Sequence, residues 1–445
     1  MNLVRATRHE TRNMKTYKEA LDHLNSLTNY ERTGFAPGTK VFDLDKLRRI
    51  LKRLGDPRTG YRRIHVAGTK GKGSICSFTS SILKESGYRT GLFTSPHLDD
   101  VRERIKIDGE NITGDDFAEV LGILENYIAG EELTYFEVCT LMAVLHFGMK
   151  KVDFAVFETG LGGRWDATNI VDAEVCGISP VSYDHTDILG SELEDIAREK
   201  AAIVKKGSAC VSSAQREEVL DVIGERCAEV DASLALVGKD ITYEVRDIGQ
   251  EGSSFSVYGR ENTYEECRTE MPGRFQVANC AAAVGICEKA LKSSADAVRF
   301  KKGIRSAFIP GRMEVLYRRP LVVIDGAQNG DSAMQLKYSV EQIFKYDRLV
   351  LLLGLSKDKD IKSVCHWLAP IADEIVLTRA SVSRAADPDI IRGYIKGKPV
   401  SVTGDVKEAL GTAFRLAGRD DMILATGSFF VAGEVRNLLM TKVIR

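Results

Sequence analysis

The sequence predicts an α/β protein made of two domains, each built around a largely parallel sheet. Short apolar runs alternate with amphipathic helical patterns over nearly the whole chain, which is typical of parallel strands joined by crossover helices. The 445 residues, 44% of them hydrophobic, exceed what one compact core requires. The segment SAFIPGR then interrupts the periodicity between two differently organised halves. We therefore predict domains at 1–307 and 308–445, the second being smaller.

The individual elements follow from the spacing of apolar residues. In the first half we expect strands at 63–68, 90–95, 152–158 and 175–180, and helices at 74–85, 115–128, 137–147 and 276–291. Residues 240–271 change to short alternating segments and should form antiparallel hairpins. The second half repeats strand and helix through LVVID, RLVLLLGL, DEIVLT and DMILATG. Each of these runs ends in Asp, Gly or Thr, as expected where strands end at a ligand cleft.

Composition excludes several classes of protein. The 62 basic and 63 acidic residues give a net charge of -1, which argues against a broad nucleic-acid surface. No apolar run approaches the length of a membrane-spanning helix. The 9 cysteines are scattered and never form C-x-x-C, which favours free thiols in a reducing, cytoplasmic compartment. Residues 1–18 lack apolar periodicity, and we expect them to be disordered, with Met14 as a plausible alternative initiator.

The strongest local signal is HVAGTKGKGS, which lies between a predicted strand and a predicted helix. Its glycines allow a tight turn that directs backbone N–H groups toward an anion, and its lysine can neutralise a β or γ phosphate. Gly73 falls between Lys72 and Ser74, so the strict phosphate-loop spacing is not met. The alternative is a basic glycine turn. We predict that the loop binds ATP through these residues: Gly68, Thr69, Lys70, Gly71, Lys72, Gly73 and Ser74.

Hard oxygen ligands for Mg²⁺ should lie at the carboxyl ends of the strands. Ser95 and Glu158 each end a predicted strand, and His185 follows another. Taken singly, these residues fit equally well as a turn hydroxyl, a helix cap and an ordinary loop imidazole.

Lys200 lies on a predicted helix that Ser191 and Glu194 should open as a capping box. Ile196, Lys200 and Ile203 fall on one face of this helix. A lysine held on an apolar face should have a lowered pKa and a nucleophilic neutral amine. On the residues alone, a lysine whose stem merely covers the apolar face is the favoured alternative.

These motifs together resemble the ATP-dependent folylpolyglutamate synthases and dihydrofolate synthases, relatives of the Mur ligases. The resemblance runs from about residue 30 to residue 436 and rests on motifs that occur in this order: GTKGKGS, FTSPHLDDVRERI, TYFE, FETGLGGRWDATN, DHTDILG, IAREKAAI, PGRMEV, DGAQN, KDKD and TGSFFVAGEVR. It implies a phosphate-loop-containing, Mur-ligase-like N-terminal domain. It also implies a Rossmann-like C-terminal glutamate ligase domain.

The resemblance also implies roles for individual residues. Ser95, Glu158 and His185 match magnesium ligands, and Lys200 matches a carbamylated lysine that helps to hold a second magnesium ion. The residues that match ATP contacts across the domain boundary are Asn279, Arg312 and Asp325. Those that match contacts to a pterin-bearing substrate are Thr134, Tyr135, Phe136, Glu137, Trp165, Asp166 and Ala167. For Tyr135 and Phe136, packing in the core is an equally good interpretation. Arg102 and Arg104 either bind a substrate carboxylate or cover the site.

Three positions depart from the family pattern. Gln328 stands where the family usually has histidine, Gly330 where it often has proline, and Lys70 where bacterial relatives commonly have asparagine. Glutamine cannot become cationic, so a charge-dependent role at residue 328 is in doubt.

The expected function is an ATP- and Mg²⁺-dependent ligase that joins L-glutamate to dihydropteroate or to the glutamyl tail of a folate through an acyl phosphate. We predict two magnesium ions, catalytic roles for Lys72, Glu158, His185 and Lys200, a monomer, and no nucleic-acid or membrane partner. The bifunctional form is favoured over folylpolyglutamate synthase activity alone. A Mur-type ligase of UDP-muramyl peptides and a non-catalytic nucleotide-binding module are the weaker alternatives.

Overall fold

The computed structural model describes residues 16–33 and 43–441. The expected disorder of residues 1–15 lies outside this range. It is wrong for residues 16–18, because helix α1 (Tyr17–Asn25) begins there. Thr16 and Glu19 form a reciprocal capping box at its start, which satisfies backbone N–H groups that would otherwise fray.

The first half of the chain forms an eight-stranded sheet in the order β4-β3-β2-β5-β1-β6-β7-β8. All neighbouring strands from β2 to β8 pair in parallel, and β3 and β4 add an antiparallel edge. The strands are β1 (Arg62–Ala67), β2 (Thr90–Phe93), β3 (Ile105–Ile107), β4 (Glu110–Asn111), β5 (Phe154–Glu158), β6 (Val175–Ile178), β7 (Ala209–Ser212) and β8 (Ser233–Leu236). The predicted parallel sheet is therefore confirmed, with strand ends shifted by at most two residues.

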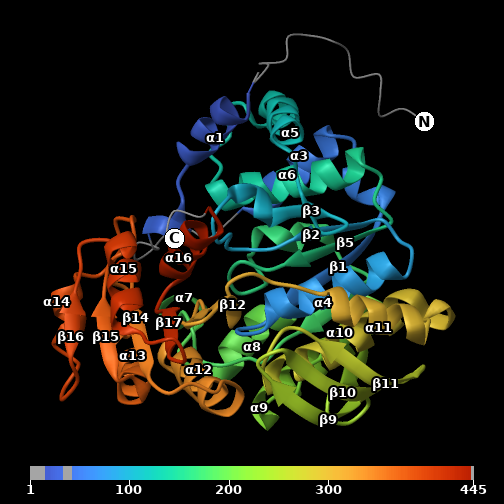
Figure 1. Cartoon of the computed structure of the whole chain (residues 1–445). Helices are drawn as coiled ribbons and strands as arrows, with labels where there is room; N and C mark the ends of the chain where they lie inside the picture. Colours follow the sequence, from blue (N-terminus) through green and yellow to red (C-terminus); the bar gives the residue numbers. More distant parts are fainter. Residues whose placement is uncertain (1–15, 34–42, 442–445) are drawn as a thin grey trace.

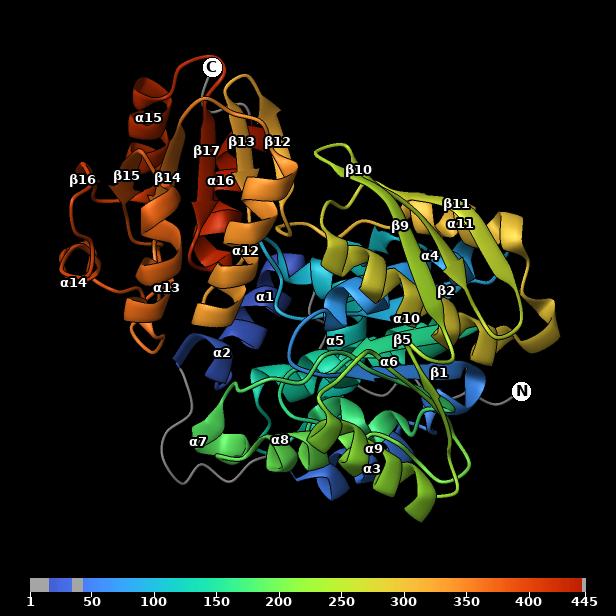
Figure 2. The same ribbon diagram turned by 90° about the horizontal axis from the view of Figure 1, so that it is seen from below.

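Helices cover both faces of this sheet (Figures 1 and 2). One core contains side chains of α4 (Lys72–Glu85), α10 (Arg274–Leu291) and α11 (Ala297–Ser306). The other contains side chains of α3 (Leu44–Arg53), α5 (Gly114–Ile128), α6 (Tyr135–Met149), α8 (Leu193–Ala201) and α9 (Glu217–Glu229). Short elements complete this half: α2 (Tyr30–Thr33), α7 (Thr186–Leu189), η1 (Pro57–Gly60), η2 (Val101–Arg104), η3 (Ala167–Val171) and η4 (Lys292–Ser294).

Residues 242–269 form the predicted antiparallel hairpins. They make a three-stranded sheet of β9 (Thr242–Gly249), β10 (Gly252–Tyr258) and β11 (Thr263–Thr269). The buried side chains of this sheet join the core of α4, α10 and α11. The small sheet thus packs against the helices on this side of the large sheet.

The second half forms a six-stranded sheet in the order β12-β13-β17-β14-β15-β16, and only β12 runs antiparallel to its neighbour. Its strands are β12 (Glu314–Arg318), β13 (Leu321–Ile324), β14 (Leu349–Leu353), β15 (Glu374–Leu377), β16 (Val400–Val402) and β17 (Met422–Thr426). Helices α12 (Gly330–Ile343), α13 (Ile361–Leu368) and α14 (Pro388–Arg392), with η5 (Ala369–Ile371), pack on one face. Helices α15 (Val406–Leu416) and α16 (Phe429–Met440) pack on the other. The predicted boundary between residues 307 and 308 falls in the segment between α11 and β12.

Two general features complete the fold. All 9 cysteines are buried and unpaired, as their scattered spacing predicts. Within residues 16–33 and 43–441, no helix is both long enough and apolar enough to cross a membrane.

Candidate active site

The predicted phosphate loop connects the end of β1 to the start of α4, and two of its glycines are required by geometry. Gly71 precedes the helix with φ 87°, in the left-handed region where glycine is favoured. A Cβ on Gly68 would lie 1.9 Å from Ser179 Oγ, so no larger residue fits there. The helix geometry leaves the N–H groups of Lys72, Gly73 and Ser74 without intrahelical partners. These N–H groups can therefore bind an anion at the positive end of the helix dipole.

The first part of the loop is attached to the segment that follows β6. The N–H groups of Thr69 and Lys70 donate to Pro180 O at 3.0 and 3.3 Å. Thr69 Oγ1 donates to Ser182 O at 3.0 Å and accepts from Ser182 N at 3.1 Å. The backbone N–H groups of Thr69 and Lys70 are therefore already bonded, and anion binding by backbone falls to the residues at the helix start.

Two lysines converge on one carbonyl of the loop. Lys72 Nζ donates to Gly68 O at 3.3 Å, and Lys200 Nζ donates to the same oxygen at 2.9 Å. Only 4% of Lys200 is exposed, so its amine lies beneath the loop rather than in solvent. Burial, and then the neighbouring charge of Lys72, lowers the pKa of Lys200 to about 7. A substantial fraction of neutral amine is thus available near neutral pH.

The predicted capping box in front of Lys200 is wrong. Helix α8 begins at Leu193 after Glu192, and no side chain caps its N-terminus. Ser191 Oγ instead contacts Glu192 Oε1 at 3.4 Å. Ile203 follows the end of the helix, although it is buried in the same core as Ile196. The helix is therefore fixed by packing rather than by a local cap, and Lys200 still lies on its buried face.

Glu158 and Ser95 meet directly beside the phosphate loop. Glu158 Oε2 accepts from Ser95 N at 3.1 Å, and 6% of Glu158 is exposed. A Cβ on Gly73 would lie 3.4 Å from Glu158 Oε2, which places the carboxylate against the start of α4. Burial raises the pKa of Glu158, while the charge of Lys72 and the bond from Ser95 oppose that rise. Ser95 and Glu158 therefore lie together against the start of α4, with the charge of Lys72 nearby.

His185 lies on a neighbouring loop rather than in direct contact with Glu158. It adopts a left-handed backbone, with φ 51°, immediately before α7, and its Nε2 lies 3.8 Å from Asp184 Oδ1. Burial lowers the pKa of His185, and the charges of Lys359, Lys72 and Lys200 add to this effect against Asp184. Its side chain is 40% exposed, and the lowered pKa favours the neutral imidazole.

A divalent cation fits this group only in part. In the part of the chain that the structure describes, no three His, Cys, Asp or Glu side chains lie close enough to hold a metal ion by themselves. Mg²⁺ normally takes only one or two carboxylates and completes its shell with phosphate oxygens and water. The buried carboxylate of Glu158 beside Ser95 fits that pattern, because phosphate oxygens would supply the remaining ligands.

The three residues predicted to contact ATP across the domain boundary have different surroundings. Asn279, on α10, is buried beside the loop, and a Cβ on Gly71 would lie 2.5 Å from its Oδ1. The Arg312 guanidinium lies 4.4 Å from the centre of the Phe429 ring. Asp325 accepts from Met313 N at 2.9 Å and Ala327 N at 2.8 Å, so its carboxylate already fixes the turn that carries Arg312.

A pocket joins these groups across the two halves of the chain. Glu158 and Arg312 contribute to its wall, and Phe429 contributes from α16. The remaining lining residues are Gly73, Ser77, Leu92, Thr94, Ser95, Pro96, Leu98, Glu103, Lys106, Phe308, Ile309 and Pro310. The pocket thus lies at the edge of the phosphate loop and beneath the linker between the halves.

The predicted substrate segment at residues 134–137 is mostly structural in its visible contacts. Thr134 and Glu137 form the capping box of α6, and Glu137 Oε1 lies 3.7 Å from Lys46 Nζ. Tyr135 and Phe136 are buried in the core, and the Arg104 guanidinium lies 5.3 Å from the centre of the Tyr135 ring. The core-packing interpretation of both aromatic residues is therefore the one that matches their placement.

The second predicted substrate segment, residues 165–167, contains one exposed residue and two buried ones. Trp165 is 51% exposed, whereas Asp166 and Ala167 are buried. Asp166 Oδ2 accepts from Gly160 N at 2.9 Å and Leu161 N at 2.8 Å, and its Oδ1 accepts from the N–H and hydroxyl of Thr168. Its carboxylate thereby closes the loop that presents Trp165.

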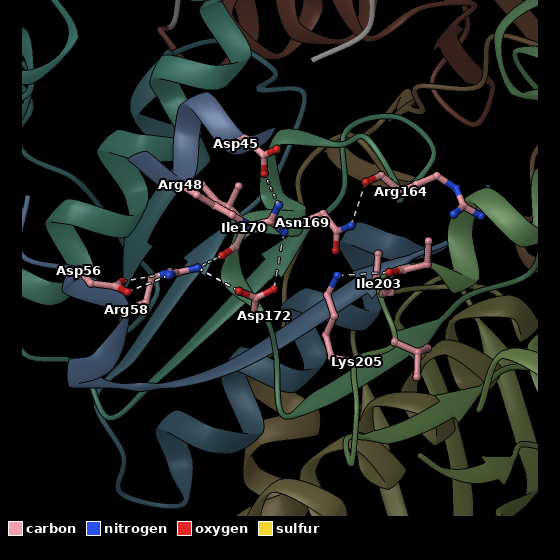
Figure 3. Close-up of polar contacts among 12 residues, drawn as sticks. Asp45, Arg48, Asp56, Arg58, Arg164, Asn169, Ile170, Asp172, Ile203 and Lys205 are labelled. Atoms are coloured by element: carbon pink, nitrogen blue, oxygen red, sulfur yellow. Dashed lines mark hydrogen bonds and ion pairs between the residues drawn. The ribbon is translucent and has the colours of Figure 1, made fainter. Parts of the chain in front are cut away.

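A network of charges anchors the element that follows this loop (Figure 3). Arg58 pairs with Asp56 and Asp172 and donates to Ile170 O on η3. Asn169 Nδ2 donates to Arg164 O at 2.9 Å, next to Trp165. These contacts hold the Trp165 loop on a rigid base.

The contacts of Arg104, which the sequence predicts to bind a substrate carboxylate or to cover the site, come from distant parts of the chain. Arg104 is fully buried, pairs with Glu31 through both terminal nitrogens, and donates from Nε to His97 Nδ1 at 2.8 Å. Arg384 Nη1 donates to Glu31 O at 2.6 Å and so joins the second half to this group. These partners lie 73 and 353 residues apart along the chain, beyond the reach of any local pattern.

The departures from the family pattern lie at the start of α12. Lys70 Nζ approaches Asp331 Oδ2 to 3.4 Å and so links the phosphate loop to this helix. The N–H of Gln328 donates to Ser332 Oγ at 3.1 Å. A Cβ on Gly330 would lie 2.9 Å from Ser363 Cβ, so the glycine allows α12 and α13 to pack closely.

Comparison with known sequences assigns both halves of the chain to recognised domains. Residues 66–287 match the Mur ligase middle domain, and residues 311–429 match the Mur ligase glutamate ligase domain. The dihydrofolate synthase/folylpolyglutamate synthase of Bacillus subtilis is 30% identical over 416 residues, covering 91% of this chain and 96% of the relative. A protein of Haloferax volcanii described as "Probable bifunctional folylpolyglutamate synthase/dihydropteroate synthase" is 34% identical over 94% of this chain. The present chain spans about half, 50%, of that relative's length.

Solved structures share the whole architecture. Folylpolyglutamate synthase of Mycobacterium tuberculosis complexed with ADP has a TM-score of 0.88 and 29% identity, covering 95% of this chain and 98% of that one. The Escherichia coli FolC complex with DHPP and ADP has a TM-score of 0.85 and 28% identity, covering 97% and 99%. The Yersinia pestis enzyme complexed with AMPPNP and Mn ion has a TM-score of 0.84 and 26% identity, covering 97% and 100%.

Proposed function

Because the chain belongs to the folylpolyglutamate synthase/dihydrofolate synthase family of Mur ligases, we propose that it is an ATP-dependent ligase that adds L-glutamate to a pteroyl or folyl carboxylate. The observation that carries the proposal is the convergence of Lys72 and Lys200 on Gly68 O, next to the buried Glu158–Ser95 pair. This arrangement suits a triphosphate whose transferring group needs charge stabilisation.

The proposed reaction has two steps. An oxygen of the acceptor carboxylate forms a bond to the γ-phosphorus of ATP as the bond to the bridging oxygen breaks and ADP leaves. The glutamate nitrogen then forms a bond to the acyl carbon, the acyl C–O bond breaks, phosphate leaves and the amine gives up a proton. Activation is necessary because phosphate is a far better leaving group than oxide.

The residues of the site would divide this work between them. The N–H groups of Lys72, Gly73 and Ser74 would bind phosphate oxygens, and the Lys72 ammonium would offset charge on the transferring phosphoryl group. Asn279 and Arg312 would fix the nucleotide from α10 and the linker. Closure of the second half over the cleft would keep water from the acyl phosphate.

Magnesium would be held by Ser95, Glu158 and His185, with a second ion held by Lys200 if its neutral amine is carbamylated. Bound there, the ions would neutralise phosphate charge. The similar Yersinia pestis enzyme contains a Mn ion with AMPPNP, which supports a divalent cation at this site.

On the acceptor side, Trp165 is the predicted substrate residue with an exposed ring, and it could stack on a flat heterocycle. Dihydropteroate and folates are both proposed acceptors, because the names of the bacterial relatives combine the two activities. Folylpolyglutamate synthase activity alone is the alternative. A ligase for UDP-muramyl peptides is less favoured, because the relatives that match over nearly the full chain carry folate-type names.

The function is tested with purified protein, ATP, Mg²⁺ and labelled glutamate, offered with dihydropteroate or with tetrahydrofolate. We expect label in both products, and none when AMPPNP replaces ATP. Label in one product only would decide between the bifunctional and monofunctional forms. Label in neither, with the protein folded and binding nucleotide, would contradict the proposal.

A further inference from the structure

Two backbone N–H groups of the phosphate loop bond to a single peptide group of the segment 178–182. Pro180 O accepts from Thr69 N and Lys70 N on the loop side. The N–H of Val181, which belongs to the same peptide group, donates to Gln215 Oε1 at 2.9 Å on the opposite side. Because the group is planar and rigid, fixing its N–H direction also fixes its carbonyl direction. Gln215 therefore orients the acceptor that holds the loop.

The other end of the Gln215 amide binds the same segment. Nε2 donates to Ser179 O at 3.0 Å and reaches Ile178 O at 3.5 Å. A glutamine amide offers one acceptor oxygen and a donor nitrogen, and here each faces its complement. Gln215 thus spans the residues that end β6, from its own position between β7 and α9. If the Gln215 amide were flipped, its NH₂ group would face the N–H of Val181 and its oxygen would face the carbonyl of Ser179.

The segment that Gln215 fixes also touches the loop at its first glycine and leads to His185. Ser179 Oγ lies where a Cβ of Gly68 would be, at 1.9 Å, so a small displacement of Ser179 alters the space for the loop. Ser182 makes two hydrogen bonds with the Thr69 hydroxyl. His185 comes three residues after Ser182. One side chain thereby controls a segment that carries both the support of the loop and a proposed metal ligand.

We propose that Gln215 is a positioning residue for the nucleotide and metal site. It touches neither ligand and acts through the Pro180–Val181 peptide. Loss of its hydrogen bonds to Val181 N and Ser179 O should change the orientation of this peptide and so the position of the loop. The inference rests on the proposed function for its catalytic meaning, but its structural content concerns nucleotide binding alone.

The test compares Gln215→Met with the parent chain by calorimetric titration of Mn²⁺ plus AMPPNP. Methionine matches glutamine in length but neither accepts from Val181 N nor donates to Ser179 O. We expect the dissociation constant to rise about tenfold, the result of losing about two neutral hydrogen bonds. The KM for ATP should rise in parallel, while the KM for the folate acceptor stays within about twofold. Gln215→Glu keeps the acceptor for Val181 N and should fall between the two.

Asn126→Ala is the matched control, because the Asn126 amide donates to two carbonyls of its own helix, α5. It should leave nucleotide binding unchanged. Unaltered nucleotide affinity in folded Gln215→Met, or equal rises in the KM for ATP and for folate, would overturn the proposal. If Gln215→Met does not fold, parent-like nucleotide affinity in Gln215→Glu at pH 8, together with parent-like affinity in Gln215→Ala, would overturn it as well. A parent chain that binds nucleotide but joins no glutamate would refute the ligase function and leave the binding comparison valid.

Discussion

The phosphate site and the two predicted substrate segments use their polar side chains in opposite ways. At the phosphate site, Lys72, Lys200 and Glu158 project from different elements toward one loop, and the N–H groups at the start of α4 are left for a ligand. In the substrate segments, the carboxylates of Glu137 and Asp166 accept hydrogen bonds from nearby backbone N–H groups. A polar residue in a recognisable motif is therefore available to a ligand only where the local backbone leaves it free.

The comparison also separates two kinds of support. The phosphate loop is held by backbone bonds to residues 180–182, so it is rigid before any ligand binds. The substrate side is held by the ion pair between the buried Arg104, beside Tyr135, and the partly exposed Glu31. Each of the following variants changes one of these two regions and leaves the other as it is in the parent chain.

The largest effect is expected for Lys72→Ala. Loss of the ammonium that offsets charge on the transferring phosphoryl group should lower kcat by about 10³-fold or more, because preorganised charge is among the strongest contributions to catalysis. Circular dichroism and the unfolding midpoint should be unchanged. Lys84→Ala, in the last turn of the same helix, is the control and should retain parental activity. A wild-type rate in Lys72→Ala would remove the phosphate loop from the mechanism.

A smaller effect, on stability, is expected for Glu31→Gln. Burial alone would raise the pKa of Glu31, but the charge and hydrogen bonds of Arg104 outweigh it and lower that pKa. Its contribution is therefore complete above the unfolded value of 4.5 and is lost as the pH falls through the lower folded value. The variant should lose about 2 kcal/mol of unfolding free energy at pH 7, because a buried arginine loses its partner.

Urea titrations at pH 7 and at a series of lower pH values would measure this effect. The difference between parent and Glu31→Gln should shrink as the solution becomes more acidic. Glu229→Gln is the control, because its ion pair with Arg226 is exposed and should contribute at most about 0.5 kcal/mol. A constant difference at all pH values would show that the Glu31 charge is not the source of the stability.

The smallest effect is expected for Trp165→Ala. Removing an exposed aromatic face should raise the KM for the pteroyl or folyl substrate about tenfold, since stacking on a heterocycle contributes about 1–3 kcal/mol. Stability should change by less than about 0.5 kcal/mol. Asp166→Asn should instead lower the stability of the protein, because the buried Asp166 carboxylate accepts four hydrogen bonds. Steady-state kinetics and urea unfolding of both variants test this difference. The same changes of KM and of stability in both variants would contradict it.

Local patterns predicted the fold well, for physical reasons that particular elements illustrate. The alternation of apolar runs with amphipathic helices is a direct consequence of burial, and β1, β5 and β6 lie where that pattern places them. Helix starts were less predictable. Helix α6 begins with a true capping box at Thr134 and Glu137, whereas the similar pair Ser191 and Glu194 caps nothing. Packing on the sheet decides the start of α8, and a short motif does not contain that information.

The site shows the same division. The strand-end rule correctly grouped Ser95 with Glu158, because parallel strands end at one edge of the sheet. Gln215 was not predicted, and Arg104 was singled out without its partner. Gln215 reaches Val181 across 34 residues, and Arg104 reaches Glu31 across 73. Such partners follow from tertiary contact alone.

The left-handed backbone of His185 places stability and the choice of side chain at this position in opposition. A side chain in that conformation costs about 1 kcal/mol relative to glycine, which would occupy the same turn without penalty. Selection for thermal stability alone would therefore favour glycine at residue 185, and the proposed role of the imidazole as a metal ligand would oppose that replacement. Libraries screened for heat tolerance without a turnover assay should accordingly accumulate glycine at this turn, as at the other non-glycine residues with positive φ, and lose the imidazole.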